Sequence, residues 1–307
     1  MKEKVSVVIT CYNHEEYIAE CLRSIFSQSY QNIELLVFND GSTDSSGAII
    51  NQLLSEESPY EETYYFTEKN RGLAHVRNDA LQKITGDFLL FVDSDNFLES
   101  HHIETLLTKL KKTNSDIAYC QLWNFQEKQN ILAEDLEFSL EKMLQGNIID
   151  ASSLVRVSKI QNASFDLKLN NRALEDYDFW LNLIVYNEAR PIFVEETKLN
   201  YRVVDGSMSE RGNWKNYYKS YFYILDKYKR QIPQDIIEAL KGETLRWLDQ
   251  YEVLLNDSKN IITQRDEYIQ KQETLIKVKE SENKQLRNSR SFRLGNKLLH
   301  PFRKIKP

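Results

Sequence analysis

Two aspartates, Asp93 and Asp95, directly follow an apolar run from Phe88 to Val92. The run is short and uninterrupted, which predicts a buried strand rather than a helix. Side chains two residues apart on an extended backbone point the same way, so both carboxylates should share one face at the strand's end. Mg²⁺ or Mn²⁺, which prefer hard oxygen ligands, would relieve their repulsion. A solvated turn is the alternative, because Asp and Ser both favour turns.

A second acidic set, Glu175, Asp176 and Asp178, opens a segment whose apolar residues follow a helical period. Acidic residues in a first helical turn interact favourably with the helix dipole, by ~0.3–1 kcal/mol each. A purely structural explanation of this set therefore exists beside a catalytic one.

The elements that must position these carboxylates alternate between strands and helices. Strand, helix and strand within about 30 residues form a right-handed βαβ unit, so the strands should be parallel. The predicted fold is a doubly wound, mixed but mainly parallel α/β sheet with a helical C-terminal extension. The strand ends that carry Tyr12, Asp40 and Asp93 should face one crevice. The predicted strands cover residues 5–10, 33–38, 64–66 and 88–92, and the intervening helices cover 15–28, 48–54 and 74–83.

Composition bounds the classes of protein to which the chain can belong. With 307 residues it can bury a large core, and a net charge of −6 gives no argument for a nucleic-acid partner. We expect neither a signal peptide nor a membrane span, because no apolar run reaches the ~18 residues that a span needs. Three scattered thiols, Cys11, Cys21 and Cys120, lack metal-ligand spacing and are expected to be buried and reduced, as in the cytoplasm.

Five motifs, in this order and spacing, closely resemble those of family 2 glycosyltransferases. These are inverting enzymes with the nucleotide-diphospho-sugar transferase (GT-A) fold, and the resemblance covers roughly residues 4–210. The motifs are Val-Ser-Val-Val-Ile-Thr-Cys-Tyr-Asn, Asn-Asp-Gly-Ser-Thr-Asp, Asn-Arg-Gly-Leu-Ala-x-x-Arg-Asn, Gly-Asp-Phe-Leu-Leu-Phe-Val-Asp-Ser-Asp and Leu-Glu-Asp-Tyr-Asp-Phe-Trp.

The resemblance implies a nucleotide-sugar donor site. Tyr12 would stack on the base, Asp40 would accept a base N–H such as uracil or thymine offers, and the Arg77 guanidinium would bridge base and diphosphate. A UDP-sugar is therefore the expected donor. The alternatives are a core aromatic residue for Tyr12, a turn residue for Asp40 and a surface ion pair for Arg77. The full expected set is Thr10, Tyr12, Asp40, Asn70, Arg77, Asp93 and Ser94.

The resemblance also assigns the chemistry to the two acidic sets. Asp95 would bind Mn²⁺ or Mg²⁺ directly, with Asp93 beside it near the ribose and the sugar. The metal would offset the charge that develops on the leaving diphosphate. Asp176 would be the general base that deprotonates the acceptor hydroxyl, Glu175 would orient the acceptor or a neighbouring side chain, and Asp178 would be structural.

The sequence departs from the family pattern at several positions. Thr10 stands where many relatives have proline, Asn39 where an aspartate is usual, and Asn96 where a further acid is common. In the late loop, Val204 occupies a position at which a histidine often sits. Whether Asp205 or water replaces that histidine as a metal ligand is left open.

The segment 121–170 is predicted to be polar and irregular. Its aromatic residues Trp123 and Phe125, together with Trp180, are candidates for the lining of an acceptor groove. The sequence does not place them.

The chain changes character after residue 212. An aromatic stripe at helical spacing between 214 and 228 is expected to pack on the catalytic domain, and Pro233 should start another helix. Adjacent apolar pairs then repeat every seven residues, as at 254/255 and 261/262. This pattern allows a long helix on the catalytic domain or a coiled-coil homodimer. The predicted domains are 1–212 (donor half about 1–98, acceptor half about 99–212), a packing segment 213–253, a long helix 254–286 and a basic tail 287–307.

The tail carries seven Lys or Arg residues and no acid, interleaved with apolar side chains such as Phe292 and Leu298. This composition suits an anionic membrane surface, and a basic disordered tail is the alternative. The sequence therefore predicts a metal-dependent inverting glycosyltransferase that is cytoplasmic, peripheral on the inner membrane face and active on a lipid-linked surface glycan. A nucleotidyltransferase of similar fold and a non-catalytic scaffold are the alternatives. The first would need a Gly-rich phosphate loop after the first strand.

Overall fold

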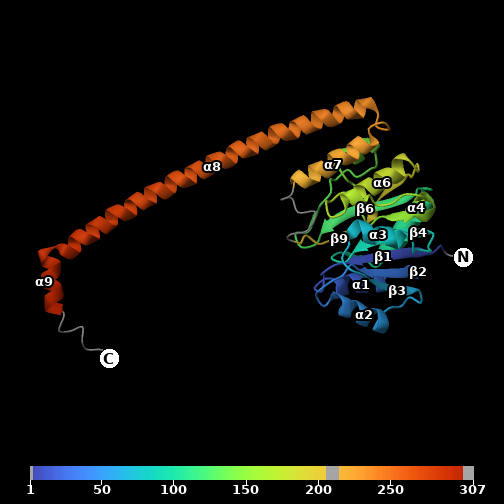
Figure 1. The fold of residues 1–307 in the computed structure, drawn as a ribbon, viewed down its shortest axis with the longest axis horizontal. Coiled ribbons are helices and arrows are strands. Elements are labelled where there is room, and N and C mark those ends of the chain that lie inside the picture. Colours follow the sequence, from blue (N-terminus) through green and yellow to red (C-terminus); the bar gives the residue numbers. More distant parts are fainter. Residues whose placement is uncertain (1–2, 205–213, 300–307) are drawn as a thin grey trace. The chain divides into compact units, whose positions relative to one another are not determined.

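A computed structural model describes residues 3–204 and 214–299 of the chain (Figure 1). The chain forms two compact units, Met1–Ile237 and Glu238–Pro307. The first unit thus extends beyond the domain boundary predicted at residue 212.

From β1 to β4 the first unit alternates strands and helices in the predicted order. The strands are β1 Val5–Cys11, β2 Ile33–Asn39, β3 Thr63–Thr67, β4 Phe88–Asp93, β5 Phe97–Leu98, β6 Ile117–Asn124, β7 Gln129–Asn130, β8 Leu154–Arg156 and β9 Pro191–Tyr201. The helices are α1 Ile18–Phe26, α2 Ser46–Glu56, α3 Leu73–Leu81, α4 His102–Lys112, α5 Leu140–Gln145, α6 Glu175–Val185 and α7 Trp214–Tyr228, with 3₁₀ turns η1 Val157–Lys159 and η2 Leu167–Leu169. The helix α8 Gln234–Asn288 continues into the second unit, which also contains α9 Arg290–Leu299.

The sheet confirms the predicted doubly wound, mainly parallel topology. Its order is β3-β2-β1-β4-β8-β6-β9-β5, and the first four strands are parallel neighbours. The chain leaves β1 on one side toward β2 and β3 and returns on the other side at β4. This change of direction creates the crevice in which ligands bind in such folds. Cys11 pairs with Asn39 and Thr10 with Asp93, so the three predicted strand ends lie level.

The two faces of the sheet have separate apolar layers because strand side chains alternate. Val5, Val7 and Ile9 of β1 face the core that α1, α2 and α4 cover. On the other side, Phe91 packs edge-on against Phe165, with the ring centroids 5.5 Å apart. All of these side chains are buried, so the carboxylates at the strand ends stand on a rigid, close-packed base.

The prediction that residues 121–170 are irregular is wrong. This segment contains the end of β6, β7, α5, β8 and both 3₁₀ turns, and it buries Met143, Leu144 and Ile149. Its elements are short, β8 having three residues and α5 six. No hydrophobic period develops over so few residues, and the pairing of β8 with β4 and β6 decides their conformation.

The predicted packing of the aromatic stripe is confirmed for Tyr221 and Tyr228, which are buried, but not for Phe222, which is 50% exposed. Ile224 and Tyr228 are fully buried, and the Tyr221 hydroxyl donates to the Leu144 carbonyl at 2.5 Å. The helix α8 begins directly after Pro233, as predicted, and is continuous. The described side chains from 253 to 288 are exposed, including the repeated apolar pairs. Within the part of the chain that the structure describes, no helix is long and apolar enough to cross a membrane.

Candidate active site

The two predicted carboxylates at the end of β4 share one face, as their spacing requires. Asp93 and Asp95 are partly exposed, whereas Ser94 and Asn96 between and after them are buried. Asp93 accepts a hydrogen bond from the Thr10 hydroxyl at 3.3 Å. Thr10 thus acts on the predicted donor site through Asp93.

The surroundings of Asp95 disfavour its charged form. Burial, and then the charge of Asp93, raises the pKa of Asp95 to about 7. No Lys or Arg among the described residues forms an ion pair with Asp95, so its charge lacks a direct protein counter-charge. The described residues also bring no cluster of three or more Asp, Glu, His or Cys into metal-binding geometry. A carboxylate pair without further protein ligands fits Mg²⁺ or Mn²⁺, which complete their shells with waters and substrate phosphates.

Arg77 is placed differently from its predicted role. Its side chain is 1% exposed, and Nη2 pairs with Asp93 Oδ1 while Nη1 pairs with Glu175 Oε1, both at 2.9 Å. The guanidinium carbon lies 5.6 Å from the ring centre of Phe91 and 5.5 Å from that of Phe165. A guanidinium held in this way joins the two acidic sets. This placement fits neither the predicted bridge between base and diphosphate nor the alternative of a surface ion pair.

The helix that carries the second acidic set has a strained start. Ala173 and Leu174 both have φ of 68°, in the left-handed region that side chains with a Cβ rarely adopt. Leu174 is the N-cap residue and supplies no side-chain hydrogen bond to the helix. Strain of this kind is found where a fold must aim a functional side chain. Here it directly precedes Glu175 and Asp176.

Asp176, the predicted base, is half-buried at this helix start. Its Oδ1 accepts from the Tyr177 N–H at 2.8 Å and its Oδ2 from the Asn147 amide at 2.9 Å. Burial, followed by the charges of Glu175 and Asp150, raises the pKa of Asp176 well above its ordinary value. A carboxylate with a raised pKa is a better proton acceptor than an ordinary aspartate.

Asp150 is a carboxylate of this crevice that the sequence analysis missed. Burial and the charge of Asp93 raise its pKa to about 6, and its own charge raises the pKa values of Asp95 and Asp176. Asp150 is therefore close enough to both acidic sets for its charge to act on them. An isolated aspartate in a polar segment gave no periodic or motif signal that would have identified it.

The crevice consequently holds an excess of carboxylates. Asp95, Asp150 and Asp176 form no ion pair with Arg77 in the described part of the chain. Their pKa values are raised by burial and by the charges of neighbouring carboxylates. Such a crevice suits a substrate that brings a divalent cation with it, and it also suits proton abstraction by one of the carboxylates.

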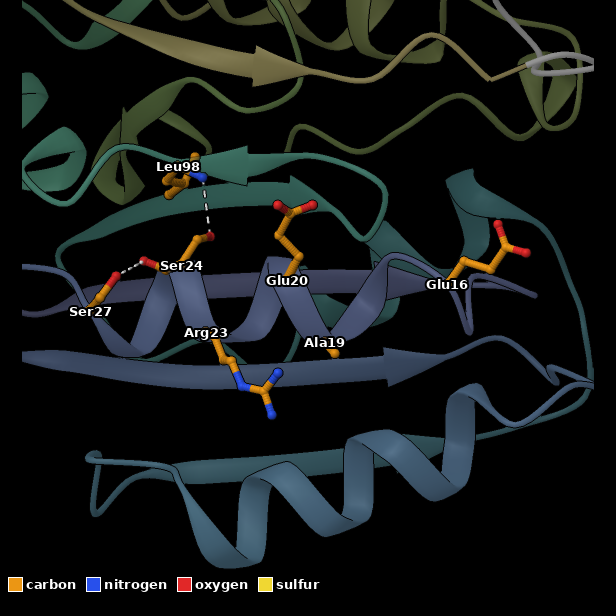
Figure 2. A pocket seen from close by; sticks show the side chains of 7 residues that line it. All are labelled: Glu16, Ala19, Glu20, Arg23, Ser24, Ser27 and Leu98. Carbon is orange, nitrogen blue, oxygen red and sulfur yellow. Dashed lines mark hydrogen bonds between the residues drawn. The ribbon is translucent and has the colours of Figure 1, made fainter. Parts of the chain in front are cut away.

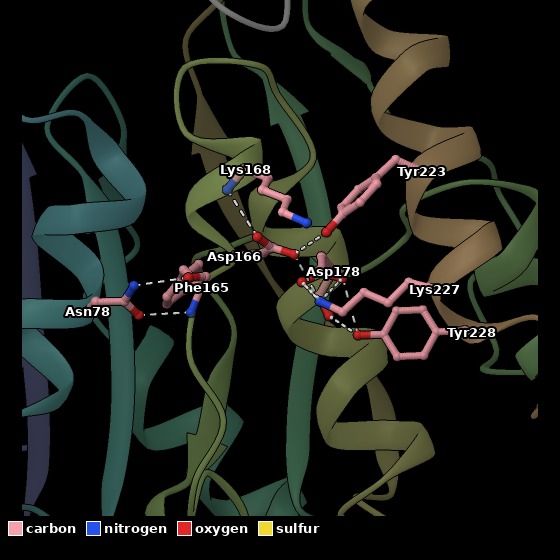
Figure 3. Close-up of polar contacts among 8 residues, drawn as sticks. All are labelled: Asn78, Phe165, Asp166, Lys168, Asp178, Tyr223, Lys227 and Tyr228. Atoms are coloured by element: carbon pink, nitrogen blue, oxygen red, sulfur yellow. Dashed lines mark hydrogen bonds and ion pairs between the residues drawn. The ribbon is translucent and has the colours of Figure 1, made fainter.

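The role predicted for Asp178 as a structural residue is confirmed. Asp178 is fully buried, and Lys227 of α7 donates to both of its carboxylate oxygens, at 2.7 and 2.8 Å (Figure 3). The Tyr228 hydroxyl donates to Asp178 Oδ1 at 3.1 Å, and Lys227 also reaches Asp166 at 3.2 Å. This network fixes α6 against α7 close to the predicted base.

The remaining donor-site residues fall into two groups. Tyr12 is 45% exposed at the end of β1, and Asn70 is exposed as well, so both side chains are accessible to a ligand. Asp40 is buried and accepts from the backbone N–H groups of Arg71 and Gly72, each at 2.8 Å. This contact holds the loop before α3 and supports the structural alternative for Asp40.

Ser94 does not present its hydroxyl to the crevice. It is fully buried, and its Oγ lies 2.7 Å from His14 Nδ1. Burial lowers the pKa of His14 despite the charge of Asp93. No role was predicted for His14, although a polar residue soon after a strand end is a usable signal of a ligand-binding edge.

Arg202 fixes the loop that carries Asp95. Its guanidinium carbon lies 4.7 Å from the ring centres of both Tyr17 and Phe125, and its Nε donates to the Asp95 carbonyl at 3.0 Å. Its other end pairs with Glu20 of α1. Of the late loop, the structure describes Val204 but not Asp205, which lies outside the described residues together with the rest of that loop.

A cavity of 640 Å³ lies along α1 (Figure 2). There, the Leu98 N–H donates to the Ser24 hydroxyl at 3.1 Å and ties β5 to α1. None of the predicted site residues lines this cavity, so it is separate from the crevice. Its lining residues are Glu16, Ala19, Glu20, Arg23, Ser24, Ser27 and Leu98.

The prediction that Trp180 lines an acceptor groove is wrong, because the side chain is 1% exposed in the core beneath α6. Phe125 is half-buried against Phe97, with the ring centroids 4.9 Å apart. Trp123 is also half-buried, and Lys198 Nζ lies 3.9 Å from its ring centre. The amphipathic pattern of α6 buries the tryptophan, while the edge of the sheet leaves the other two rings partly accessible.

Comparison with known proteins identifies the family of the chain. The family model of glycosyl transferase family 2 matches residues 6–173, more than half of the chain. The chain belongs to glycosyltransferase family 2. The part of the chain that matches the family model ends at residue 173, just before α6. Leu174, α6 and α7 therefore lie outside the match.

Its relatives include glycosyltransferases of several bacteria. It is 30% identical to glycosyltransferase GlyA of Streptococcus pneumoniae over 228 residues, which are 67% of this chain and 32% of GlyA. It is 31% identical to the teichoic acid poly(glycerol phosphate) polymerase of Staphylococcus epidermidis over 60% of this chain and 26% of that protein. The chain thus spans about a third or less of these two relatives. An uncharacterized glycosyltransferase of Haemophilus influenzae is 28% identical over 77% of this chain and 92% of its own length.

Two solved structures show the same fold. Staphylococcus aureus TarS 1–349 in complex with UDP has a TM-score of 0.62 at 20% identity and covers 79% of this chain and 70% of its own. The mannosyltransferase PcManGT of Pyrobaculum calidifontis, in complex with GDP-Man and Mn²⁺, has a TM-score of 0.61 at 18% identity, covering 79% of this chain and 69% of its own. The GT-A fold predicted from the sequence is therefore confirmed.

The double ion pair of Arg77 generates a stability prediction. In Arg77→Lys, one ammonium group replaces the planar fork and cannot reach both Asp93 and Glu175 in the same geometry. One buried carboxylate then loses its partner, and we expect the free energy of unfolding to fall by about 3 kcal/mol in urea denaturation.

Arg23→Lys is the matched control, because Arg23 makes a two-pronged ion pair with Glu57 on the exposed surface. It should cost less than about 1 kcal/mol. Equal losses in the two variants would contradict a special role for the buried pair.

Proposed function

We propose that this chain transfers a sugar, with inversion, from a UDP-sugar to a hydroxyl group of a cell-surface glycan. The observation that carries the proposal is the joining of two acidic sets by one buried arginine. Asp93 and Asp95 lie at the end of β4, Glu175 and Asp176 at the start of α6, and Arg77 pairs with a member of each set. Inverting transfer needs such an arrangement, with a diphosphate site on one side of the sugar and a base on the other.

On the donor side, the chain supplies an exposed ring, a carboxylate pair and a fixed loop. Tyr12 would stack on the uracil, and Asp95, with Asp93 beside it, would hold Mg²⁺ or Mn²⁺ against the diphosphate. When bound, the metal would stabilise the negative charge of the leaving nucleoside diphosphate. Arg202 would keep Asp95 in place through its backbone carbonyl. The UDP complex of TarS and the Mn²⁺ complex of PcManGT support this donor and metal.

On the acceptor side, Asp176 would take the proton of the attacking hydroxyl. Its raised pKa suits proton abstraction near neutral pH. Glu175 would act through its ion pair with Arg77. This pair would hold the start of α6, which carries Asp176, at a fixed distance from the donor site.

The reaction class is tested by release of nucleoside diphosphate. UDP-, dTDP- and GDP-sugars are screened by thermal shift with Mn²⁺, and the sugar nucleotide with the largest shift is then assayed for hydrolysis, in which water takes the place of the acceptor. We expect a UDP-sugar to bind and to be hydrolysed slowly. Binding without hydrolysis would favour the scaffold alternative, and activity with a sugar phosphate and a nucleoside triphosphate would favour a nucleotidyltransferase.

The base is predicted to be Asp176 and not its neighbour. Asp176→Asn keeps the shape of the side chain but cannot accept a proton, so hydrolysis of the selected sugar nucleotide should fall by ~10²–10⁴ with unchanged donor affinity. Glu175→Gln should have a smaller effect on turnover. Near-normal turnover of Asp176→Asn beside an inactive Glu175→Gln would show that the two roles are reversed.

The metal is predicted to be required. EDTA should abolish hydrolysis reversibly, and added Mn²⁺ should restore it, because Asp93 and Asp95 leave the diphosphate charge uncompensated without a cation. Asp95→Ala should be inactive at any Mn²⁺ concentration, with an unchanged far-ultraviolet circular dichroism spectrum. Full activity in EDTA would overturn the metal-dependent mechanism.

We further propose that the acceptor is lipid-linked. In this proposal the C-terminal tail, residues 287–307, holds the enzyme on the inner face of the cell membrane. The relationship to a teichoic acid polymerase supports a cell-surface polymer as product. In α9, Phe292, Leu294 and Leu298 are exposed and alternate with Arg290 and Arg293, as in helices that bind anionic lipid. The apolar pairs of α8 repeat every seven residues and are exposed, which favours pairing with a second copy of this helix.

One truncation separates the two proposed roles of the extension. Deletion of residues 287–307 should abolish flotation with vesicles that contain anionic lipid at low salt, because it removes the basic apolar helix. The truncated protein should still sediment as a dimer and hydrolyse the selected sugar nucleotide at the wild-type rate. Flotation of the truncated protein would refute the membrane role, and a monomeric full-length protein would refute pairing through α8.

A further inference from the structure

The loop between α5 and β8 contacts the predicted base from a segment in which the sequence identified no site residue. Asn147 Nδ2 donates to Asp176 Oδ2 at 2.9 Å, across 29 residues of sequence. The contact joins this loop to the first turn of α6. It is a direct hydrogen bond to the group that would accept the proton.

The orientation of the Asn147 amide follows from a second hydrogen bond. Its Oδ1 accepts from the backbone N–H of Ile149 at 3.2 Å. Because the oxygen end is used by the loop itself, the NH₂ end must face Asp176. The amide can therefore only donate to the carboxylate.

The loop is held in place by contacts within the protein. Just before it, in the last turn of α5, Leu144 accepts a hydrogen bond at its carbonyl from the Tyr221 hydroxyl of α7, at 2.5 Å. At its end, Asp150 Oδ1 accepts from Ser152 N–H at 2.8 Å, and its carbonyl accepts from the Ser153 hydroxyl at 2.7 Å. Asn147 is thus presented from a supported loop and does not depend on the acceptor for its position.

The two hydrogen bonds on Asp176 leave room for a third partner. Oδ1 is engaged by the Tyr177 N–H and Oδ2 by Asn147, yet a carboxylate offers about four acceptor positions. We propose that Asn147 is a positioning residue for the glycosyl transfer, whose amide holds the Asp176 carboxylate with a free lone pair turned toward the acceptor hydroxyl. This inference rests on the proposed function, because it requires Asp176 to be the base.

Besides the neutral amide of Asn147, several charged or titratable groups lie near Asp176. Glu175 on the same helix and Asp150 on the loop raise its pKa, and Arg77 of α3 lowers it. Tyr217 of α7 is near enough for the charge of Asp176 to raise the pKa of the tyrosine hydroxyl. The Asn147 N–H stabilises the ionised carboxylate, so its removal must raise the pKa of Asp176 further.

The test is the pH profile of Asn147→Ala in hydrolysis of the sugar nucleotide selected by thermal shift. We expect the acid limb of kcat/KM to move to higher pH by about one unit, so that activity below the limb falls about tenfold and approaches that of the wild type at high pH. The isosteric Asn147→Asp should move the limb further, because a carboxylate then faces a carboxylate. The affinity for UDP and the melting temperature should stay unchanged in Asn147→Ala.

Gln145→Ala is the matched control, because it removes an exposed amide two residues away. It should leave the profile unchanged. A loss of activity in Asn147→Ala that is equal at every pH, or no loss at all, would overturn the positioning role. Near-normal turnover of Asp176→Asn would instead show that the base assignment, and so the proposed function, has failed.

Discussion

The charge of a single buried side chain determines how the two halves of this catalytic unit meet. Arg77 is 1% exposed, and a guanidinium cannot be neutralised by giving up its proton. It therefore needs carboxylates on both sides, and Asp93 and Glu175 supply them at 2.9 Å each. Removing one partner of a buried ion pair leaves an uncompensated charge, which is far more costly than the pair is stabilising. Strand β4 and helix α6 are consequently bound to each other by a contact that neither can replace.

The start of α6 shows where the fold stores strain and what balances it. Ala173 and Leu174 have backbone conformations in the left-handed region. Neither is glycine, the residue that adopts this region without strain. The compensation comes from α7, since Ser220 donates to the Arg172 carbonyl at 3.2 Å and Lys227 pairs with buried Asp178. Helix α7 is for this reason part of the catalytic unit, although it follows the predicted end of the catalytic domain. It contacts both α6, through Lys227, and α5, through the Tyr221 hydroxyl.

The sequence by itself determined the parallel half of the sheet, the helices between its strands and the positions of most acidic groups. The strands β1, β2 and β4 are short apolar runs, and parallel strands joined by helices must bring their carboxyl ends to one edge. That is why the spacing of Asp93 and Asp95 was enough to place both carboxylates on one face. The buried state of Cys11, Cys21 and Cys120 followed from the same patterns.

Only the tertiary structure decided which of these groups meet. Arg77 pairs with Glu175 across 98 residues, Asn147 with Asp176 across 29 and Lys227 with Asp178 across 49. The period of apolar residues shows which face of a helix or strand is buried. It does not show which residue of another element that face contacts. The sequence therefore placed Arg77 on a helix but not inside the protein, left Trp180 as a candidate for a groove although it lies in the core, and assigned no role to Asn147 or Asp150. Burial made the difference, because a charge excluded from water must find its counter-charge wherever the fold has placed one.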